Sequence, residues 1–255
     1  MSKQPLITNQ NKFDLKILLV GNSGAGKTHF TGTYTKGPIH YYMFDYGGEK
    51  TLAKLNQNRP ECSPITIDII NPRRDDYSKF WTMLQKDERA GMFDEFASKN
   101  GLIVLPDSLT ALDSMILASV AKNNSRDLTS DKNGMRIQDW GQVIAWVKSL
   151  INVINSLPCA VVTTAHLVTE TDKEGNVVNR YPSVTGQYKS SIGKDFDEVY
   201  YLTTKQKSRM ISMGNYDNFQ AKSRVFSALK LSDPTMDIIA DAYINNKLTF
   251  EGDKE

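Results

Sequence analysis

The octapeptide GNSGAGKT at residues 21–28 constrains this chain more than any other feature. It fits the phosphate-binding pattern G-x-x-x-x-G-K-[ST] at every fixed position, and the apolar run ILLV at residues 17–20 precedes it. A buried strand that leads through such a loop into a helix presents backbone N–H groups and a positive helix end to phosphates. A glycine-rich turn without a ligand is the alternative, and chance matches to this pattern are rare. We therefore predict a nucleoside triphosphate site here.

Each residue type in the loop suits that chemistry. We expect Lys27 to reach the β and γ phosphates and Thr28 to ligate Mg²⁺ through its hydroxyl. The glycines permit backbone shapes and close approaches that a Cβ would block. The segment expected to contact ATP comprises Gly21, Asn22, Ser23, Gly24, Ala25, Gly26, Lys27, Thr28 and His29.

Composition bounds the class of protein only loosely. With 31 basic and 29 acidic residues the net charge is +2, so any role with nucleic acid depends on local patches. Cys62 and Cys159 are the only cysteines, which is too few for a disulfide scaffold, and we expect both to be structural. No apolar stretch approaches the roughly 18 residues of a membrane span, and the polar N-terminus does not read as a signal peptide. We expect a soluble, cytoplasmic protein.

Strand and helix patterns alternate along most of the chain. Strands are predicted at residues 15–20, 39–44, 65–70, 101–105 and 160–164, and helices at residues 27–34, 75–86, 108–122 and 138–156. This alternation predicts an α/β fold with a mostly parallel central sheet flanked by helices. Residues 198–203, 210–213 and 224–228 predict a smaller antiparallel extension, closed by a helix at 236–244. We expect a flexible arm over residues 1–12, a single domain over 13–250 and a tail over 251–255.

Three carboxylates are candidates for the chemistry around the phosphates. Asp107 ends the apolar strand LIVLP and is the candidate second residue on the Mg²⁺ side, although it could also cap the next helix. Pro106 removes a ladder N–H, which the last position of a strand tolerates. Asp45 and Glu49 follow the second strand and could orient the attacking water. We prefer Glu49, because Gly47 and Gly48 could swing it toward the nucleotide, and a surface role for either stays open.

His166 follows the apolar strand AVVTTA, so its ring lies at the carboxyl edge of the sheet, where α/β proteins bind ligands. It could sense the γ phosphate, or it could be a satisfied structural histidine. His29 and His40 are expected to be structural.

Taken together, GNSGAGKT, IVLPDSLTAL at residues 103–112, the strand into TTAH and AKSR at residues 221–224 resemble the RecA-like recombinase core. The chain looks most similar to its short bacteriophage members, the single-strand annealing and recombination-mediator ATPases, over about residues 15–230. The resemblance implies a RecA-like P-loop NTPase core, ATP hydrolysis with Mg²⁺, action on single-stranded DNA and a homo-oligomeric ring or filament. It also implies a phage-encoded protein of the host cell cytoplasm, with a possible single-strand binding protein or annealing partner.

The resemblance also implies individual roles. Asp107 takes the Walker B position with Ser108 beside it, and His166 takes the position that couples the γ phosphate to a DNA loop. Lys222 and Arg224 match a basic pair that enters the neighbouring subunit's nucleotide site, although two solvated side chains are the plain alternative. The absence of long N- and C-terminal domains puts strand exchange by this chain alone in doubt. The candidate catalytic residues are Lys27, Glu49, Asp45, Asp107, His166, Lys222 and Arg224.

Two long polar segments lie where RecA-like cores carry their DNA loops, at residues 123–138 and 168–194. Cations for phosphates and tyrosines for base stacking are the features of single-strand binding. Acidic residues in the same segments oppose this, and residues 176–182 could form a plain hairpin. The candidate DNA-binding residues are Arg126, Lys132, Arg136, Arg180, Tyr181, Tyr188 and Lys189.

The preferred function is therefore a DNA-stimulated ATPase of recombination, annealing or repair. A phosphotransferase whose polar segments close over a small substrate is one alternative. A nucleotide switch that binds ATP without turnover is another.

Overall fold

The computed structural model describes residues 12–57, 59–61, 63–130, 132–205, 208–226 and 230–245. Most of the expected N-terminal arm, Cys62, part of the predicted strand at 224–228 and the expected C-terminal tail lie outside these residues. Cys159 is buried, as expected for a structural cysteine. Within the described residues, no helix combines the length and apolar character needed to cross a membrane.

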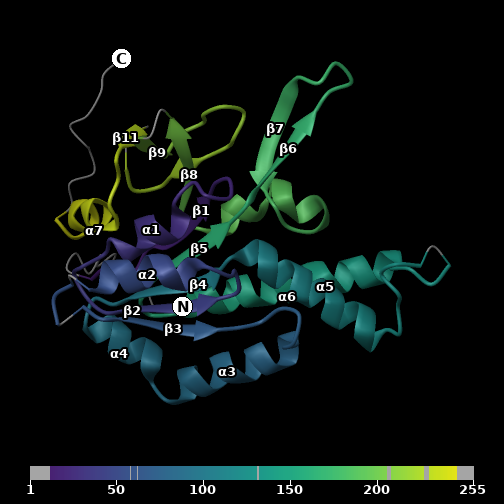
Figure 1. Cartoon of the computed structure of the whole chain (residues 1–255), viewed down its shortest axis with the longest axis horizontal. Helices are drawn as coiled ribbons and strands as arrows, with labels where there is room; N and C mark the ends of the chain where they lie inside the picture. The colour runs from purple at the N-terminus through teal and green to yellow at the C-terminus, as the bar shows by residue number, and fades with distance from the viewer. Residues whose placement is uncertain are drawn as a thin grey trace, which may run out of the picture.

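A nine-stranded sheet forms the centre of the molecule, in the order β11-β9-β8-β1-β5-β4-β2-β3, with β10 beside β8 (Figure 1). The strands are β1 (Lys16–Val20), β2 (Ile39–Met43), β3 (Ile65–Ile69), β4 (Leu102–Asp107), β5 (Ala160–Ala165), β8 (Glu198–Lys205), β9 (Ser208–Ser212), β10 (Lys222–Ser223) and β11 (Lys230–Ser232). Strands β1 to β5 and β8 run parallel, whereas β9, β10 and β11 are antiparallel to their neighbours. The predicted α/β, RecA-like P-loop class is confirmed. One detail was wrong: β8 pairs in parallel with β1 and so belongs to the main sheet.

Successive side chains along a strand point to opposite faces of the sheet, and in the central strands both sets are largely apolar and buried. Helices therefore cover both faces. Leu18 and Val20 of β1 pack into one core and Ile17 and Leu19 into the other. The first core is covered by α3 (Tyr77–Arg89), α4 (Met92–Ser98), α5 (Leu109–Asn123) and α6 (Ile137–Ser156). The second is covered by α1 (Lys27–Gly32), α2 (Gly48–Asn56) and α7 (Met236–Ile244). The sequence analysis had given no bounds for the helical stretch that is α2, and it had not predicted α4.

The parallel strands bring their carboxyl ends to one edge of the sheet. The glycine-rich loop follows β1, Asp45 follows β2, Asp107 ends β4 and His166 follows β5. Pro106 is accommodated by a bulge, because β4 has an extra residue against β2 between Val104 and Asp107.

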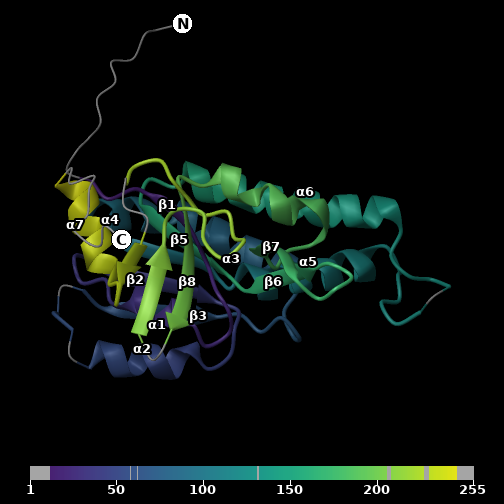
Figure 2. The same cartoon turned by 90° about the horizontal axis from the view of Figure 1, so that it is seen from above.

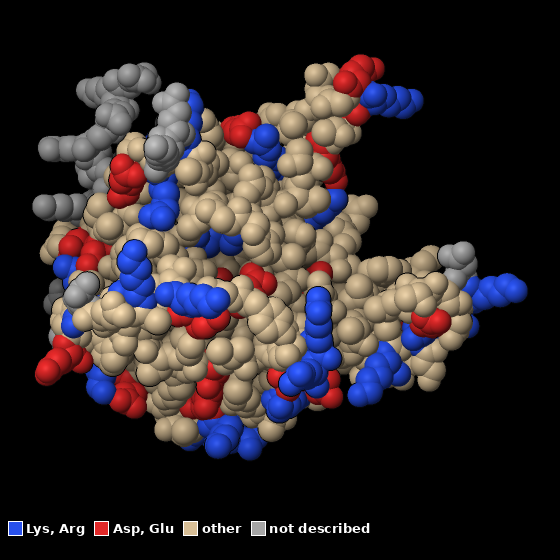
Figure 3. All heavy atoms as spheres, in the orientation of Figure 1, with Lys and Arg blue, Asp and Glu red and all other residues tan. Residues whose placement is uncertain are grey.

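Two projections extend beyond the sheet on the same side of the molecule (Figures 1 and 2). The first projection, which we call the arm, consists of the end of α5, the start of α6 and the loop between these two helices. The second is a hairpin of β6 (Leu167–Thr171) and β7 (Val177–Pro182), followed by the short 3-10 helices η1 (Gly186–Ser190) and η2 (Ile192–Asp195). Residues 177–182 thus form one strand of a longer hairpin, and not a hairpin by themselves as the sequence alternative had it. In the space-filling view an open notch separates the projections, and both carry basic and acidic side chains (Figure 3).

Candidate functional site

The glycine-rich loop has the backbone that its sequence predicts. Gly24 and Gly26 have φ values of 76° and 94°, in the left-handed region that a side chain strains. Gly26 is the N-cap of α1, and the Ala25 N–H donates to the Asn22 carbonyl at 3.1 Å. A cavity of about 1130 Å³ runs past this loop, α1 and α2. The loop therefore opens its N–H groups and a helix N-terminus onto a cavity large enough for a nucleotide.

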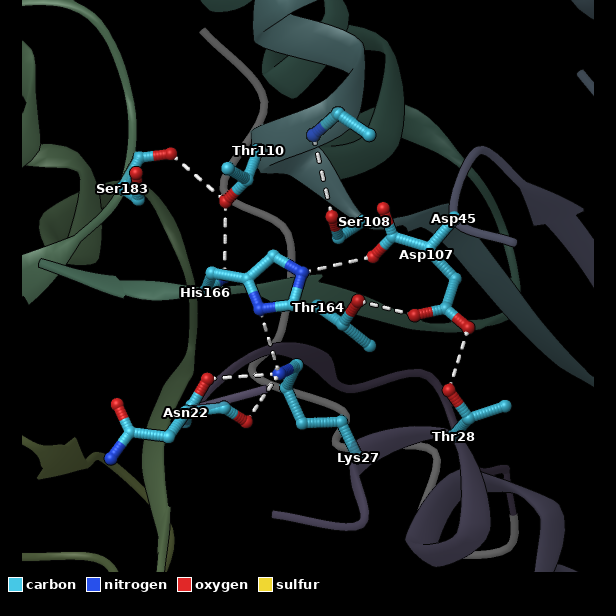
Figure 4. A network of polar contacts seen from close by, with 12 residues as sticks. Asn22, Lys27, Thr28, Asp45, Asp107, Ser108, Thr110, Thr164, His166 and Ser183 are labelled. Carbon is cyan, nitrogen blue, oxygen red and sulfur yellow. Dashed lines mark hydrogen bonds and ion pairs between the residues drawn. The ribbon is translucent and has the colours of Figure 1, made fainter. Parts of the chain in front are cut away.

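Lys27 lies at the centre of the site (Figure 4). Its Nζ donates to the carbonyls of Gly21 at 2.8 Å and Asn22 at 3.1 Å and lies 3.4 Å from His166 Nδ1. Burial lowers the pKa of this ammonium, while the carboxylates of Asp107 and Asp45 oppose the shift. The geometry places one cation between the loop and three groups from neighbouring strand ends.

Asp107 is buried and held by two hydroxyl groups. Thr28 Oγ1 donates to its Oδ2 at 3.0 Å, and Thr164 Oγ1 donates to its Oδ1 at 2.6 Å. Burial raises the pKa of Asp107, although these two hydrogen bonds oppose the shift. The N-cap of α5 is Ser108, whose hydroxyl accepts from the Ala111 N–H at 3.3 Å, so the capping role considered for Asp107 was wrong.

Asp45, and not Glu49, lies within this network. Asp45 Oδ2 is 3.1 Å from His166 Nε2. Burial disfavours its charged form, but hydrogen bonds from His166 and Ser108 outweigh burial, so the pKa of Asp45 lies below its ordinary value. Glu49 turns back onto the Gly47 N–H at 2.8 Å in the first turn of α2. In this arrangement Asp45, and not Glu49, contacts the other site residues, and which of the two orients the attacking water stays a prediction.

His166 joins the site to the structure around it. Its ring lies between Lys27 and Asp45, and its backbone N–H donates to Thr110 Oγ1 at 3.0 Å. A ring held between an ammonium and a carboxylate at the carboxyl edge of the sheet can register changes at a nearby phosphate.

ATP and Mg²⁺ fit the residues present. The loop can take the phosphates, and Thr28 and Asp107 offer the oxygen ligands that Mg²⁺ accepts beside phosphate oxygens. In P-loop ATPases the ion neutralises charge that develops on the transferring phosphate. Among the described residues no group of three or more His, Cys, Asp or Glu side chains could hold a metal, so phosphate oxygens and water would complete the ion's coordination.

The sequence analysis missed one basic residue at the loop. Arg209 comes from β9, and its Nη1 lies 3.1 Å from His29 Nδ1. Its Nε would lie only 2.5 Å from a Cβ placed on Gly26, so the guanidinium packs directly on the loop. His29 and Arg209 both line the large cavity. In contrast, His40 Nδ1 hydrogen-bonds Thr66 Oγ1 at 2.8 Å and its Nε2 lies 3.3 Å from Asp68 Oδ2, as expected for a structural histidine.

Lys222 and Arg224 lie away from this chain's own site. Lys222 pairs with Val199 on β8, and neither residue lines the nucleotide cavity. Arg224 bonds Asp197 Oδ1 at 3.4 Å and the Lys194 carbonyl at 3.0 Å, near the amino end of β1. If these residues act on a nucleotide, the geometry requires that it belong to another subunit.

Several candidate DNA-binding cations already have acidic partners. Arg126 pairs with Asp139 at 2.7 Å, Lys189 with Glu170 at 2.5 Å, and Arg180 with Asp217. Lys132 and Arg136 are exposed on the arm. The ring of Tyr181 is half-buried, with Lys189 Nζ 5.4 Å from its centre.

Tyr188 requires a correction. It is only 4% exposed and its hydroxyl donates to Asp195 at 2.7 Å, so its ring belongs to the core and does not offer a face for base stacking.

The fold and the site together define a P-loop nucleotide-binding protein. The family described as "AAA domain" matches residues 14–225, and the chain belongs to that family. The coarse prediction of a P-loop ATPase is thus confirmed, and such ATPases generally use ATP and Mg²⁺. The closer resemblance to phage annealing ATPases stays a prediction.

Comparison with known proteins adds two distant similarities. The chain is 24% identical over 198 residues to the mRNA endoribonuclease LsoA of Escherichia coli O157:H7. That match covers 75% of the chain and 56% of the relative, so the chain spans little more than half of that protein. The chain is also similar to the crystal structure of a KaiC-like protein from Pyrococcus horikoshii OT3, with a TM-score of 0.43 and 12% identity, covering 86% and 89% of the two chains.

Proposed function

We propose that this protein hydrolyses ATP and acts on single-stranded DNA in recombination, annealing or repair, as a phage-encoded RecA-like ATPase. ATP binds with Mg²⁺ at the loop, Lys27 and Thr28 hold the phosphates and the ion, and Asp45 orients the attacking water. The β6–β7 hairpin and the arm form the surface that contacts DNA.

One observation carries the proposal. His166 touches Lys27 and Asp45 through its ring, and β6 of the projecting hairpin begins at the next residue, Leu167. Any displacement of His166 at the nucleotide is therefore applied directly to the base of a projection that bears Arg180, Tyr181 and, beside it, Lys189. This arrangement supports a nucleotide-dependent interaction with a polymer outside the pocket, because none of residues 167–182 of the hairpin lines the nucleotide cavity.

The decisive measurement is the steady-state rate of ATP hydrolysis with and without single-stranded DNA at low salt. We expect DNA to raise the rate several-fold, and the rise to fade with added salt because phosphate contacts weaken. Lys27→Ala is the blank and should reduce turnover by about 100-fold or more, since it removes the cation at the phosphates. ATP turnover that ignores DNA would contradict the proposal.

The same assay can identify the nucleic acid. Because one relative is named an mRNA endoribonuclease, single-stranded RNA of the same sequence is the matched competitor. Stronger stimulation by RNA than by DNA would replace DNA in the proposal. Phosphoryl transfer to a small acceptor would support the phosphotransferase alternative, and tight ATP binding without turnover would support the switch.

Assembly is the second part of the proposal. Lys222 and Arg224 would complete the nucleotide site of a neighbouring copy in a ring or filament, supplying charge at the transition state. Arg224→Ala should then lower turnover while leaving ATP binding largely intact. Mixing Arg224→Ala with Lys27→Ala should restore part of the activity, because intact loops meet intact arginines across mixed interfaces. No recovery on mixing would count against a role in trans.

A further inference from the structure

We propose that Thr110 is the positioning residue that links the nucleotide site to the β6–β7 hairpin, so that the hairpin moves as a unit when His166 moves. The inference rests on the proposed function, in which this hairpin meets nucleic acid, and it adds the means by which one site regulates the other. Thr110 touches neither the glycine-rich loop nor the exposed cations.

The Thr110 hydroxyl bridges the two ends of the hairpin (Figure 4). Its Oγ1 accepts from the His166 N–H at 3.0 Å and donates to the Ser183 carbonyl at 2.9 Å. The Ser183 N–H in turn donates to the His166 carbonyl at 2.8 Å. His166 and Ser183 are the residues immediately before β6 and immediately after β7. One side chain thus uses its single proton and an acceptor site to close the base of the hairpin.

Thr110 is itself held firmly. It lies in the first turn of α5, where Ser108 caps the helix, and it follows Asp107 by three residues. One turn further, Asp113 Oδ2 accepts from the backbone N–H and the hydroxyl of Thr185, at 2.9 and 2.7 Å. Helix α5, which follows Asp107, therefore holds the chain that leaves the hairpin through two side chains one turn apart, Thr110 and Asp113.

This arrangement converts a displacement at the phosphates into a movement of the whole hairpin. At its ring end His166 contacts Lys27 and Asp45, and at its backbone end it contacts Thr110. Without Thr110, one backbone hydrogen bond, from the Ser183 N–H to the His166 carbonyl, would join the end of β7 to His166, and a shift would strain that bond and the pairing of Leu167 with Pro182. Because Thr110 binds both ends, the paired strands tilt together and their register is preserved.

The test compares Thr110→Val with Thr110→Ser. Valine has nearly the same shape but forms neither hydrogen bond, whereas serine keeps the hydroxyl. Thr110→Ala is a second variant that removes the hydroxyl without the β-branched side chain, in case valine impairs folding. Each protein is examined by amide hydrogen exchange over residues 167–185, with and without Mg²⁺ and a non-hydrolysable ATP analogue.

We expect the wild type and Thr110→Ser to show a nucleotide-dependent change in hairpin exchange. Thr110→Val and Thr110→Ala should lose most of it, by about five-fold, the effect expected from a lost hydrogen bond. Their affinity for the analogue should stay within about two-fold of the wild type, since Thr110 makes no contact with the loop. Asp113→Asn is the matched control, because it keeps an acceptor for Thr185, and it should respond like the wild type.

Two results would overturn the inference: a wild-type hairpin whose exchange ignores the nucleotide, or a Thr110→Val hairpin that responds fully. The outcome is separable from that of the proposed function. A hairpin that responds to nucleotide through Thr110, in a protein whose ATPase rate ignores nucleic acid, would preserve the link and refute the proposed function.

Discussion

The carboxyl edge of the sheet, where the nucleotide site lies, and the two projections both hold paired polar side chains, but the pairs differ in burial. At the edge, Asp107 is buried and bound by Thr28 and Thr164, so removing any member leaves a buried polar group unpaired. On the hairpin, the pair of Lys189 with Glu170 is partly exposed, and exposed pairs contribute only about 0–1 kcal/mol, whereas the pair of Arg126 with Asp139 on the arm is mostly buried. The nucleotide site therefore holds one geometry, whereas the exposed pair on the hairpin costs little to break, which suits the nucleic-acid contact that we propose.

The largest difference in effect is expected between the two carboxylates that follow β2, Asp45 and Glu49. Asp45→Asn should lower kcat for ATP hydrolysis by about 100-fold, because it removes the anion that His166 and Ser108 hold in its charged form. Glu49→Gln, which removes the same charge four residues away, should change kcat by less than about two-fold. Steady-state kinetics measures both. Equal losses in the two variants would mean that the ordered network does not select the reacting carboxylate.

Arg209, from β9, adds a cation to the nucleotide site. Arg209→Ala should weaken ATP binding by about ten-fold, since it removes a cation that packs on Gly26 and faces the cavity. Lys86→Ala removes an exposed charge from α3 and is the control. Equilibrium titration with a fluorescent ATP analogue gives the dissociation constants. An unchanged affinity in Arg209→Ala would restrict the site to the loop and the strand ends.

These two cases show what sequence reasoning can reach. The loop, Asp107 and His166 were predictable because each directly follows an apolar strand, and parallel strands end at a common edge. Arg209 was not predictable, because its approach to Gly26 depends on the pairing of β9 with β8. The choice between Asp45 and Glu49 depended on α2, which begins at Gly48. In its first turn the Glu49 side chain accepts a hydrogen bond from the N–H of Gly47, the N-cap residue.

The projections were harder still to predict. Sequence identified the polar segments and the hairpin alternative, but a tyrosine in such a segment looks the same whether it is buried or exposed. Tyr188 entered the core because η1 packs it against the body of the protein. Arg126 was a candidate DNA-binding cation, but Asp139, thirteen residues later in the first turn of α6, accepts a hydrogen bond from it.

If the pairs on the hairpin exchange with phosphate, removing the internal carboxylate should strengthen binding. Glu170→Gln frees Lys189 and should tighten single-stranded DNA binding about three-fold at low salt, with a steeper salt dependence. Glu174→Gln removes the same charge from the hairpin turn, at a carboxylate that pairs with no cation in the described part of the chain. Fluorescence anisotropy across a salt series distinguishes them. Equal tightening by both variants would indicate only a change in net charge.

The smallest expected effect concerns stability, and it contrasts a buried carboxylate with an exposed one. Burial raises the pKa of Asp113 above its ordinary value of 3.8, so the folded state binds a proton more readily than the unfolded state. The contribution of Asp113 to stability therefore falls as pH rises from 3.8 through its raised pKa, and this contribution is absent from Asp113→Asn. We expect this variant to be more stable at neutral pH by about 1 kcal/mol, because an amide costs less to bury than a carboxylate.

Asp127, in the loop of the arm, provides the opposite sign. A hydrogen bond from the Thr129 hydroxyl lowers its pKa, so its contribution is present above pH 3.8 and is lost as pH falls through the lowered value. Asp127→Asn should thus slightly destabilise the protein at neutral pH. Urea unfolding at several pH values measures both slopes. If the two variants shifted stability in the same direction, burial would not be what separates the interior of the molecule from its projections.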